Sequence, residues 1–130
     1  MKYIYPVILT PDGDGVLAYF PDIDGTHTDG SSIEEALVNA EDVLALMLMT
    51  MEDEQMDIKP PTPIAKLKIP ANAITALVRA DTLAYRRKVD TRAVRKSVSV
   101  PAWMDALAKE HNLNLSQLLQ NAISKELNIA

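Results

Sequence analysis

Cysteine is absent from the sequence, and its absence excludes disulfides, thiol catalysis and zinc sites built on thiolates. The chain has two histidines, His27 and His111, whose separation argues against a histidine-based zinc site. No apolar run approaches the ~18 residues of a membrane-spanning helix, and Met1–Tyr5 lacks the profile of a secretory signal peptide. We therefore expect a cytoplasmic protein with no metal and no cofactor.

Positive charge is nearly missing from the first part of the chain. Residues 1–60 contain two Lys against thirteen Asp and Glu, a net charge of −11, whereas residues 61–130 have a net charge of +6. This asymmetry predicts two partners of opposite charge, nucleic acid for the second part and a basic molecule for the first. The length of 130 residues permits one ordinary domain or two small ones.

The segment Arg95–Pro101 has the most informative pattern in the chain. Small polar and β-branched residues alternate over positions 97–100, which is the period of a strand with two different faces. Pro101 would end this strand and fit the first turn of a helix, where its missing N–H costs nothing. The apolar face of the strand consists of Val98 and Val100, and its polar face consists of Arg95, Ser97 and Ser99.

Two amphipathic helices are predicted after this strand. The first has apolar residues at helical spacing from Trp103 and ends near His111. The second begins at Asn114, a favourable N-cap, with Gln117 as its capping-box partner. The apolar stripe of the second helix consists of Leu115, Leu118, Leu119, Ala122, Ile123 and Leu127.

A unit of this size is too small to fold alone, because about 35 residues with one unpaired strand bury too little surface. We expect a two-fold dimer in which the two strands pair antiparallel and four helices close over a shared core. An ordinary strand followed by two core helices is the alternative interpretation. The predicted dimer core consists of Val98, Val100, Trp103, Leu107, Leu118, Leu119 and Ile123.

Such a dimer would present a two-stranded ribbon, which fits the major groove of DNA, where Arg can hold guanine and Ser can contact either base. The backbone amides at the start of the second helix are placed to hold a phosphate. The predicted DNA-binding set consists of Arg95, Ser97, Ser99, Asn114, Leu115 and Ser116. From Arg95 to about Leu127 the sequence resembles the ribbon-helix-helix repressors.

The first part of the chain predicts a small α/β domain. Turn residues separate short β-rich segments, and Ser32 with Glu35 forms a capping box at the start of a long amphipathic helix. Part of this helix, over residues 43–51, is apolar nearly all round, so its outer side is expected to meet another subunit or partner. The predicted strands are Tyr3–Leu9, Val16–Phe20, Thr26–Thr28 and Ala73–Val78, followed by a short helix over Asp81–Tyr85.

Between the two parts lies a basic segment with Arg86, Arg87, Lys88 and Arg92. It could reach toward DNA phosphates or simply be a solvated linker, and the sequence leaves both interpretations open. We place an acidic α/β domain at residues 1–89, a basic linker at 90–94 and the dimerisation domain at 95–130. The fold class expected is α+β.

The first half resembles the HicB-type antitoxins. The resemblance rests on Gly15, Tyr19-Phe20-Pro21-Asp22, Gly25, Thr28, Asp29-Gly30 and Glu34-Glu35-Ala36. It implies a truncated RNase H-like β-β-β-α-β domain that binds a HicA toxin, followed by a DNA-binding domain, here of the ribbon-helix-helix type. It also implies a protein that sequesters a small basic mRNA-cleaving toxin and represses its own operon. For the toxin-binding side we choose Asp22, Asp24 and Asp29 from charge and position.

Two other functions are compatible with parts of the sequence. RNase H nucleases hold two metal ions with clustered carboxylates, but the aspartates at 12, 14, 22, 24 and 29 stand in Gly- and Pro-containing turns, where Asp is common for turn geometry. We therefore expect no catalytic residue and no enzyme. The remaining alternative is a homodimeric ribbon-helix-helix regulator whose acidic domain senses a small ligand. In either case dimers could pair further into tetramers.

Overall fold

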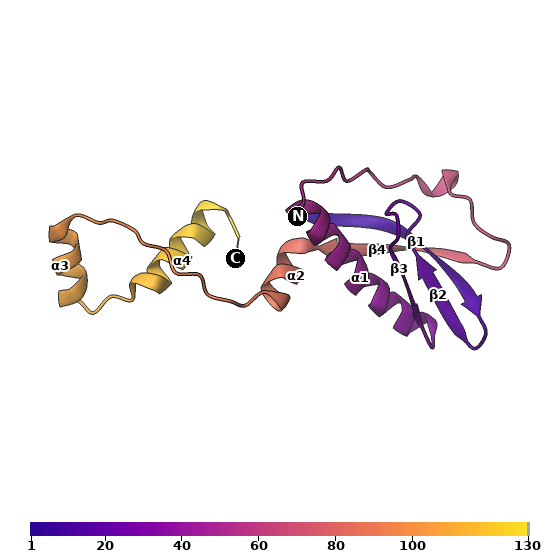
Figure 1. Cartoon of the computed structure of the whole chain (residues 1–130), viewed down its shortest axis with the longest axis horizontal. Coiled ribbons are helices and arrows are strands. Elements are labelled where there is room, and N and C mark those ends of the chain that lie inside the picture. Colours follow the sequence, from indigo (N-terminus) through magenta and orange to yellow (C-terminus); the bar gives the residue numbers. More distant parts are fainter. Residues whose placement is uncertain (130) are drawn as a thin grey trace. The chain divides into compact units, whose positions relative to one another are not determined.

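The computed structural model describes residues 1–129 of the chain (Figure 1). The chain divides into two compact units, Met1–Arg92 and Ala93–Ala130, which are called unit 1 and unit 2 below. The structure is α+β, with one four-stranded antiparallel sheet and four α-helices in the described residues. This fold class confirms the expectation from the sequence.

Unit 1 contains the sheet, whose strand order is β3-β2-β1-β4. The long strand β1 lies in the middle, and it pairs with β2 from Ile8↔Tyr19 to Asp12↔Gly15 and with β4 from Lys2↔Asp81 to Leu9↔Ile74. The element order β-β-β-α-β-α contains the predicted β-β-β-α-β order. The elements of unit 1 are β1 Lys2–Asp12, β2 Gly15–Tyr19, β3 His27–Gly30, α1 Ile33–Asp53, the 3₁₀ turn Ile64–Lys66, β4 Ile74–Asp81 and α2 Thr82–Val89.

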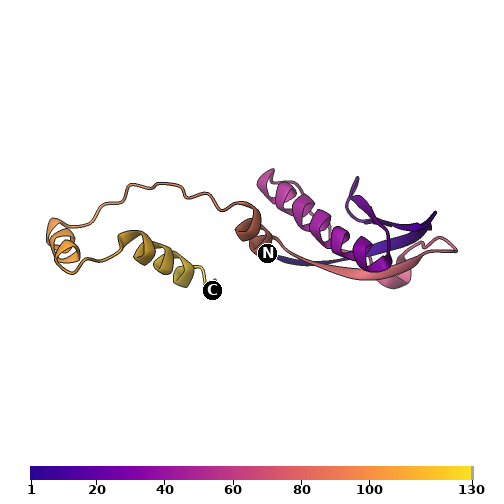
Figure 2. The same ribbon diagram turned by 90° about the horizontal axis from the view of Figure 1, so that it is seen from below.

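Helix α1 covers one face of the sheet and closes the core of unit 1 (Figure 2). Alternation along the strands turns one set of side chains toward the helix, and small residues on α1 let the two layers approach closely. At Gly30 a Cβ would lie 2.4 Å from the backbone nitrogen of Ala36, so only glycine fits where β3 meets α1. The buried cluster consists of Tyr5, Val7, Leu9, Ala18, Phe20, Ile23, Ala36, Ala40, Leu44, Ala45, Leu48, Val78 and Ala80.

The proline-rich crossing between α1 and β4 contains Pro60, Pro61, Pro63 and Pro70. It has no regular structure apart from one 3₁₀ turn, because proline lacks the backbone N–H that helices and strands need. Two buried groups fix it to the rest of unit 1. The hydroxyl of Tyr5 donates to the carbonyl of Lys59, and the carboxylate of Asp22 accepts bonds from the backbone N–H (3.0 Å) and hydroxyl of Thr62. These contacts satisfy polar groups that burial would otherwise leave unpaired.

The start of α1 follows the predicted cap with one difference. The hydroxyl of Ser32 accepts from the backbone N–H of Glu35 at 3.2 Å, as expected for an N-cap. The carboxylate of Glu35, however, bonds to the hydroxyl and the N–H of Ser31, at 2.9 and 3.3 Å. The reciprocal half of the predicted capping box is therefore wrong by one residue, because Ser31 offers two donors where Ser32 would offer one.

Unit 2 consists of two helices, α3 Ala102–Glu110 and α4 Leu115–Glu126. Residues 90–101 form neither helix nor strand in the single chain. A strand is defined by the ladder to its neighbour, so the ribbon predicted over this stretch stays a prediction that one chain cannot test. None of the helices described, in either unit, is long and apolar enough to cross a membrane.

Candidate binding surfaces

The apolar side chains of unit 2 are the most unusual feature of the surface. No side chain between residues 93 and 129 is buried. The seven predicted dimer-core residues have exposed fractions between 37% for Leu119 and 67% for Val98, and Trp103 is 64% exposed. Amphipathic helices need another protein surface to cover their apolar side chains. These side chains, on α3, α4 and the segment before them, have no such cover in the single chain. We call these seven residues, Val98, Val100, Trp103, Leu107, Leu118, Leu119 and Ile123, the unit 2 stripe.

The predicted DNA-reading residues lie in the extended segment before α3. Arg95, Ser97 and Ser99 are all exposed, and no ion pair within residues 1–129 involves Arg95. Their side chains are therefore available to a partner, although the geometry of a paired ribbon requires a second chain.

The start of α4 has the geometry expected for an anion site at a helix N-terminus. The side-chain oxygen of Asn114 accepts from the backbone N–H of Gln117 at 3.0 Å. The amides of Leu115 and Ser116 belong to the first turn, where N–H groups have no intrahelical acceptor. The side chain of Gln117 donates to Asn121 at 2.9 Å instead of returning to Asn114, so the reciprocal half of this capping box is also wrong.

The three aspartates chosen for toxin binding differ in their surroundings. Asp22 is only 5% exposed, and both of its carboxylate oxygens accept bonds from Thr62. Its role in unit 1 is therefore to hold the proline-rich crossing. Asp24 and Asp29 are exposed, and the carbonyl of Asp29 accepts from the side-chain amide of Asn39 on α1 at 2.8 Å. Two of the three carboxylates are thus free to meet a partner.

The outer face of α1 adds carboxylates and apolar side chains that the sequence reasoning did not choose. Val38 is 66% exposed and Leu46 is 42% exposed, and they alternate along the helix with exposed Glu35, Asp42 and Asp53. These exposed positions could have been predicted from the sequence. They lie on the side of α1 opposite its buried apolar stripe and recur every three to four residues. The predicted outward side of residues 43–51 corresponds in part to this face.

Beside this face, a groove of about 590 Å³ lies between α1, the end of β4 and α2. Eleven residues line it, and five of them are charged: Glu41, Asp42, Arg79, Asp81 and Lys88. Burial and the nearby charge of Asp42 raise the pKa of Tyr85, which also lines the groove. The hydroxyl of Tyr85 can donate a hydrogen bond.

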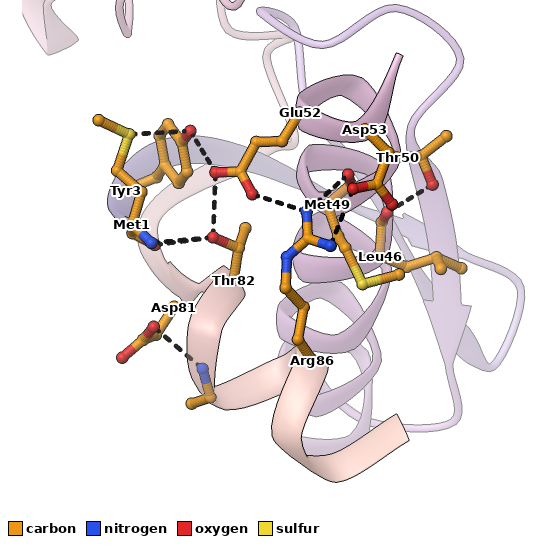
Figure 3. A network of polar contacts seen from close by, with 11 residues as sticks. Met1, Tyr3, Leu46, Met49, Thr50, Glu52, Asp53, Asp81, Thr82 and Arg86 are labelled. Carbon is orange, nitrogen blue, oxygen red and sulfur yellow. Dashed lines mark hydrogen bonds and ion pairs between the residues drawn. The ribbon is translucent and has the colours of Figure 1, made fainter. Parts of the chain in front are cut away.

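A polar network around Glu52 joins the start of β1, the end of α1 and the start of α2 (Figure 3). The Glu52 carboxylate accepts from the hydroxyls of Tyr3 (2.8 Å) and Thr82 (3.0 Å) and from the guanidinium of Arg86 (3.1 Å). Burial alone would raise the pKa of Glu52, but these hydrogen bonds outweigh it and lower the pKa. Burial and the bond to Glu52 raise the pKa of Tyr3 to about 12.

The same network fixes α2 to α1. Arg86 also pairs with Asp53 at 2.8 Å and donates to the carbonyl of Met49 at 3.2 Å. The side chain of Asp81 caps α2 by accepting from the N–H of Ala84 at 3.2 Å. The basic segment that contains Arg86, Arg87, Lys88 and Arg92 therefore begins inside α2, which is part of unit 1.

The unit boundary does not coincide with the change in charge along the sequence. Unit 1 has nine Lys and Arg against fifteen Asp and Glu, a net charge of −6, whereas unit 2 has four against three, a net charge of +1. Most of the positive charge of the second half lies in residues 61–92. In residues 1–129 no three His, Asp or Glu side chains are grouped closely enough to hold a metal ion.

Comparison with known proteins identified one protein family. The family model described as a HicB-like antitoxin of bacterial toxin–antitoxin systems matches residues 5–123, from β1 into α4 and across both units. Comparison with curated proteins gave no match.

Solved structures share the fold. A chain of a toxin–antitoxin complex from Streptococcus pneumoniae is 23% identical, with a TM-score of 0.63, over 97% of this chain and 99% of that chain. The antitoxin HicB of Burkholderia pseudomallei is 24% identical, with a TM-score of 0.54, over 97% of each chain. A chain of the HicA3 and HicB3 toxin–antitoxin complex is 27% identical, with a TM-score of 0.50, over 60% of this chain and 98% of that chain.

Proposed function

Because the chain belongs to the HicB-like antitoxin family of bacterial toxin–antitoxin systems, we propose that it is an antitoxin with two binding tasks. Unit 1, a truncated RNase H-like domain, binds and masks a small basic mRNA-cleaving toxin of the HicA type. Unit 2, a ribbon-helix-helix domain, pairs with a second copy of the chain and binds operator DNA, which represses the operon. The protein acts in the cytoplasm by binding alone, without catalysis.

The observation that carries this proposal is the exposure of the unit 2 stripe. Seven large apolar side chains on a short segment and two helices need a partner surface of the same kind, and a second copy supplies it by symmetry. Pairing of residues 97–100 from both chains would complete the missing ladder. It would also place two copies of Arg95, Ser97 and Ser99 on one exposed face, with the first turn of α4 beside the phosphates.

The toxin-binding task rests on the charge of unit 1 and on the complexes of similar proteins. An acidic surface complements the basic surface with which a ribonuclease holds RNA. The surface that we propose consists of Asp24, Asp29 and the outer face of α1 with Val38, Asp42 and Leu46. The bond from Asn39 to the carbonyl of Asp29 holds the end of β3 against α1, so Asp29 lies beside this helix.

Sensing of a small ligand is a second candidate, favoured by the groove between α1 and α2. Its volume of about 590 Å³ falls within the range of small-molecule sites. Such sites are mostly apolar, however, whereas five charged side chains line this groove. We therefore place toxin masking ahead of ligand sensing.

Co-expression with the small protein encoded alongside tests the toxin-binding task. Residues 1–92, which have a complete core, should co-purify with that protein and relieve its toxicity in cells. Replacing both Asp24 and Asp29 with Lys should weaken this protection. The same change at Asp12, the last residue of β1, and at Asp14, in the β1–β2 turn, serves as the charge-matched control. If protection requires residues 95–130, the division of tasks is wrong.

A further inference from the structure

Unit 2 has little positive charge for a DNA-binding domain. Its net charge is +1, which gives +2 for a dimer, and its cations are Arg95, Lys96, Lys109 and Lys125. Lys109 is paired with Asp105 at 3.2 Å. Non-specific affinity for duplex DNA comes mainly from neutralised phosphates, so further cations close to the ribbon are needed.

The nearest cations are those of the basic segment, and the structure separates them into two kinds. Arg86 is held by Glu52 and Asp53, and Arg92 is paired with Asp90 at 2.9 Å. Arg87 and Lys88 are exposed on α2, and neither forms an ion pair within residues 1–129. Two adjacent cations thus form no ion pair within residues 1–129, although Lys88 also lines the groove that contains Glu41, Asp42 and Asp81.

These two cations stand on a fixed support close to the ribbon in sequence. The Asp81 cap and the Arg86 network hold α2 against α1, so the helix does not need to be ordered when a partner binds. The chain from Lys88 to Arg95 is seven residues long and can span at most ~25 Å. This reach is shorter than one turn of duplex DNA, which measures about 34 Å.

We propose that Arg87 and Lys88 bind the phosphodiester backbone of duplex DNA beside the site read by the ribbon. This inference rests on the proposed operator binding by unit 2. A dimer then has four additional phosphate contacts, and α2 is a DNA-binding element on the toxin-binding unit. Binding of both partners to unit 1 gives the toxin a direct way to change the affinity for DNA.

Salt-dependent DNA binding tests the proposal with the full chain. The probes are a labelled duplex with the sequence upstream of the gene of this chain, and a scrambled duplex of the same length and composition. In the double variant Arg87→Gln/Lys88→Gln, the slope of log affinity against log salt concentration should decrease by about 3 to 4 on both duplexes, since each phosphate contact contributes about 0.9. Preference for the upstream duplex should remain.

Two control variants separate a contact from a general loss of charge. Lys66→Gln/Lys68→Gln removes the same charge from the exposed crossing of unit 1, and Arg92→Gln removes a cation that is already paired. Both should leave the slope within about one unit of the parent value. Glutamine is a good helix former, so circular dichroism and sedimentation should show an intact α2 and an unchanged assembly.

Three results would overturn the inference. An unchanged slope in the Arg87/Lys88 variant means that these side chains do not touch DNA, and an equal decrease in the Lys66/Lys68 control means that only the overall field matters. Loss of the co-purified toxin with an unchanged slope would assign the two cations to a protein partner. Failure of the proposed function looks different, because the parent chain itself would then show no preference for the upstream duplex.

Discussion

The two units solve the problem of burial in opposite ways. Unit 1 encloses its own core, with Val7, Leu44 and Leu48 completely buried between the sheet and α1. Unit 2 has helices that are as amphipathic as α1, yet the structure shows no buried side chain from residue 93 to 129. The two units differ in size and in the number of secondary-structure layers that can pack on one another. Four strands and a long helix can cover one another, whereas two short helices cannot.

This contrast indicates which part of the molecule depends on a partner for its structure and which only for its function. Unit 1 is expected to be stable alone and to use its surface for binding. Unit 2 is expected to gain its structure and its DNA-binding face in the same step. The chain also provides separate probes, because its only Trp, Trp103, is in unit 2 and all four Tyr are in unit 1.

The strongest test places a charge in the proposed dimer core. Val98→Asp would bury two carboxylates near the two-fold axis, at a cost on the order of several kcal/mol for each side chain. We expect loss of the dimer in sedimentation, loss of DNA binding and red-shifted Trp103 emission, while the tyrosine signals of unit 1 persist. Val94→Asp, at an exposed position outside the unit 2 stripe, is the matched control. A Val98→Asp dimer that still binds DNA would falsify the ribbon assignment.

The second test makes the same truncation in each unit. Leu44→Ala should destabilise unit 1 by about 2–5 kcal/mol, because the leucine is completely buried. Leu118 is 48% exposed in the single chain, yet Leu118→Ala should cost a similar amount in the Trp103 unfolding transition if a second copy covers it. Urea titrations followed by both probes measure this. An effect below ~0.5 kcal/mol at Leu118 would mean that water, not protein, covers the stripe.

The third test concerns the DNA face of the dimer. Arg95→Ala removes the only long donor from the proposed ribbon face, and a good bidentate base contact contributes ~1–3 kcal/mol. Affinity for the upstream duplex should decrease severely, with two copies lost per dimer, while sedimentation shows the dimer intact. Lys109→Ala, which removes a cation already paired with Asp105, should have a much smaller effect. Equal effects of the two substitutions would contradict direct reading by Arg95.

The smallest expected effect is the pH dependence of unit 1. The pKa of Glu52 is lowered in the folded state, so its contribution is complete above the unfolded pKa and is lost as the pH falls through the folded pKa. Glu52→Gln should reduce stability near neutral pH by ~1–3 kcal/mol and flatten the acid limb of the stability curve. Thermal unfolding of unit 1 as a function of pH measures both, with Glu54→Gln on the exposed end of α1 as control. If the Glu52→Gln and Glu54→Gln variants lost stability with falling pH at the same rate, Glu52 would not be the cause of the acid limb.

At high pH the sign is reversed for Tyr3. Its pKa is raised to about 12, so its contribution is complete below the unfolded pKa of about 10 and is lost as the pH rises toward 12. Tyr3→Phe should therefore remove part of the alkaline loss of stability. Tyr19→Phe, on an exposed position of β2, should leave that limb unchanged.

Much of the fold could be predicted from local patterns. β-rich segments bounded by turn residues identified β1, β2 and β4, and the caps Ser32, Asp81 and Asn114 identified the starts of three helices. Boundaries were less exact, since β3 is His27–Gly30 instead of Thr26–Thr28 and β1 extends to Asp12. A strand ends where its neighbour stops forming hydrogen bonds with it. The end therefore depends on the neighbouring strand as well as on the strand's own sequence.

The surfaces could be predicted less well, because they depend on contacts between distant residues. Asp22 has the same local sequence character as Asp24, and only the approach of Thr62 from the crossing gives it a structural role. The pairing of Arg86 with Glu52 likewise joins residues 34 positions apart. The dimer and DNA-binding residues of unit 2 remain predictions. Their arrangement depends on a second copy of the chain and on DNA, and both lie outside a single copy.

In the proposed dimer, the missing core of unit 2 also makes its folded state depend on how many copies are present. When two chains must meet before α3 and α4 are covered, the folded fraction of unit 2 follows mass action, and dilution lowers it while unit 1 stays folded. In a cell with few copies, we expect the C-terminal helices of a lone chain to be open to proteases, whereas its N-terminal unit would still bind the proposed toxin. If operator binding needs the dimer as proposed, operator occupancy should decrease more steeply than the number of antitoxin molecules, and repression should be relieved before protection is lost.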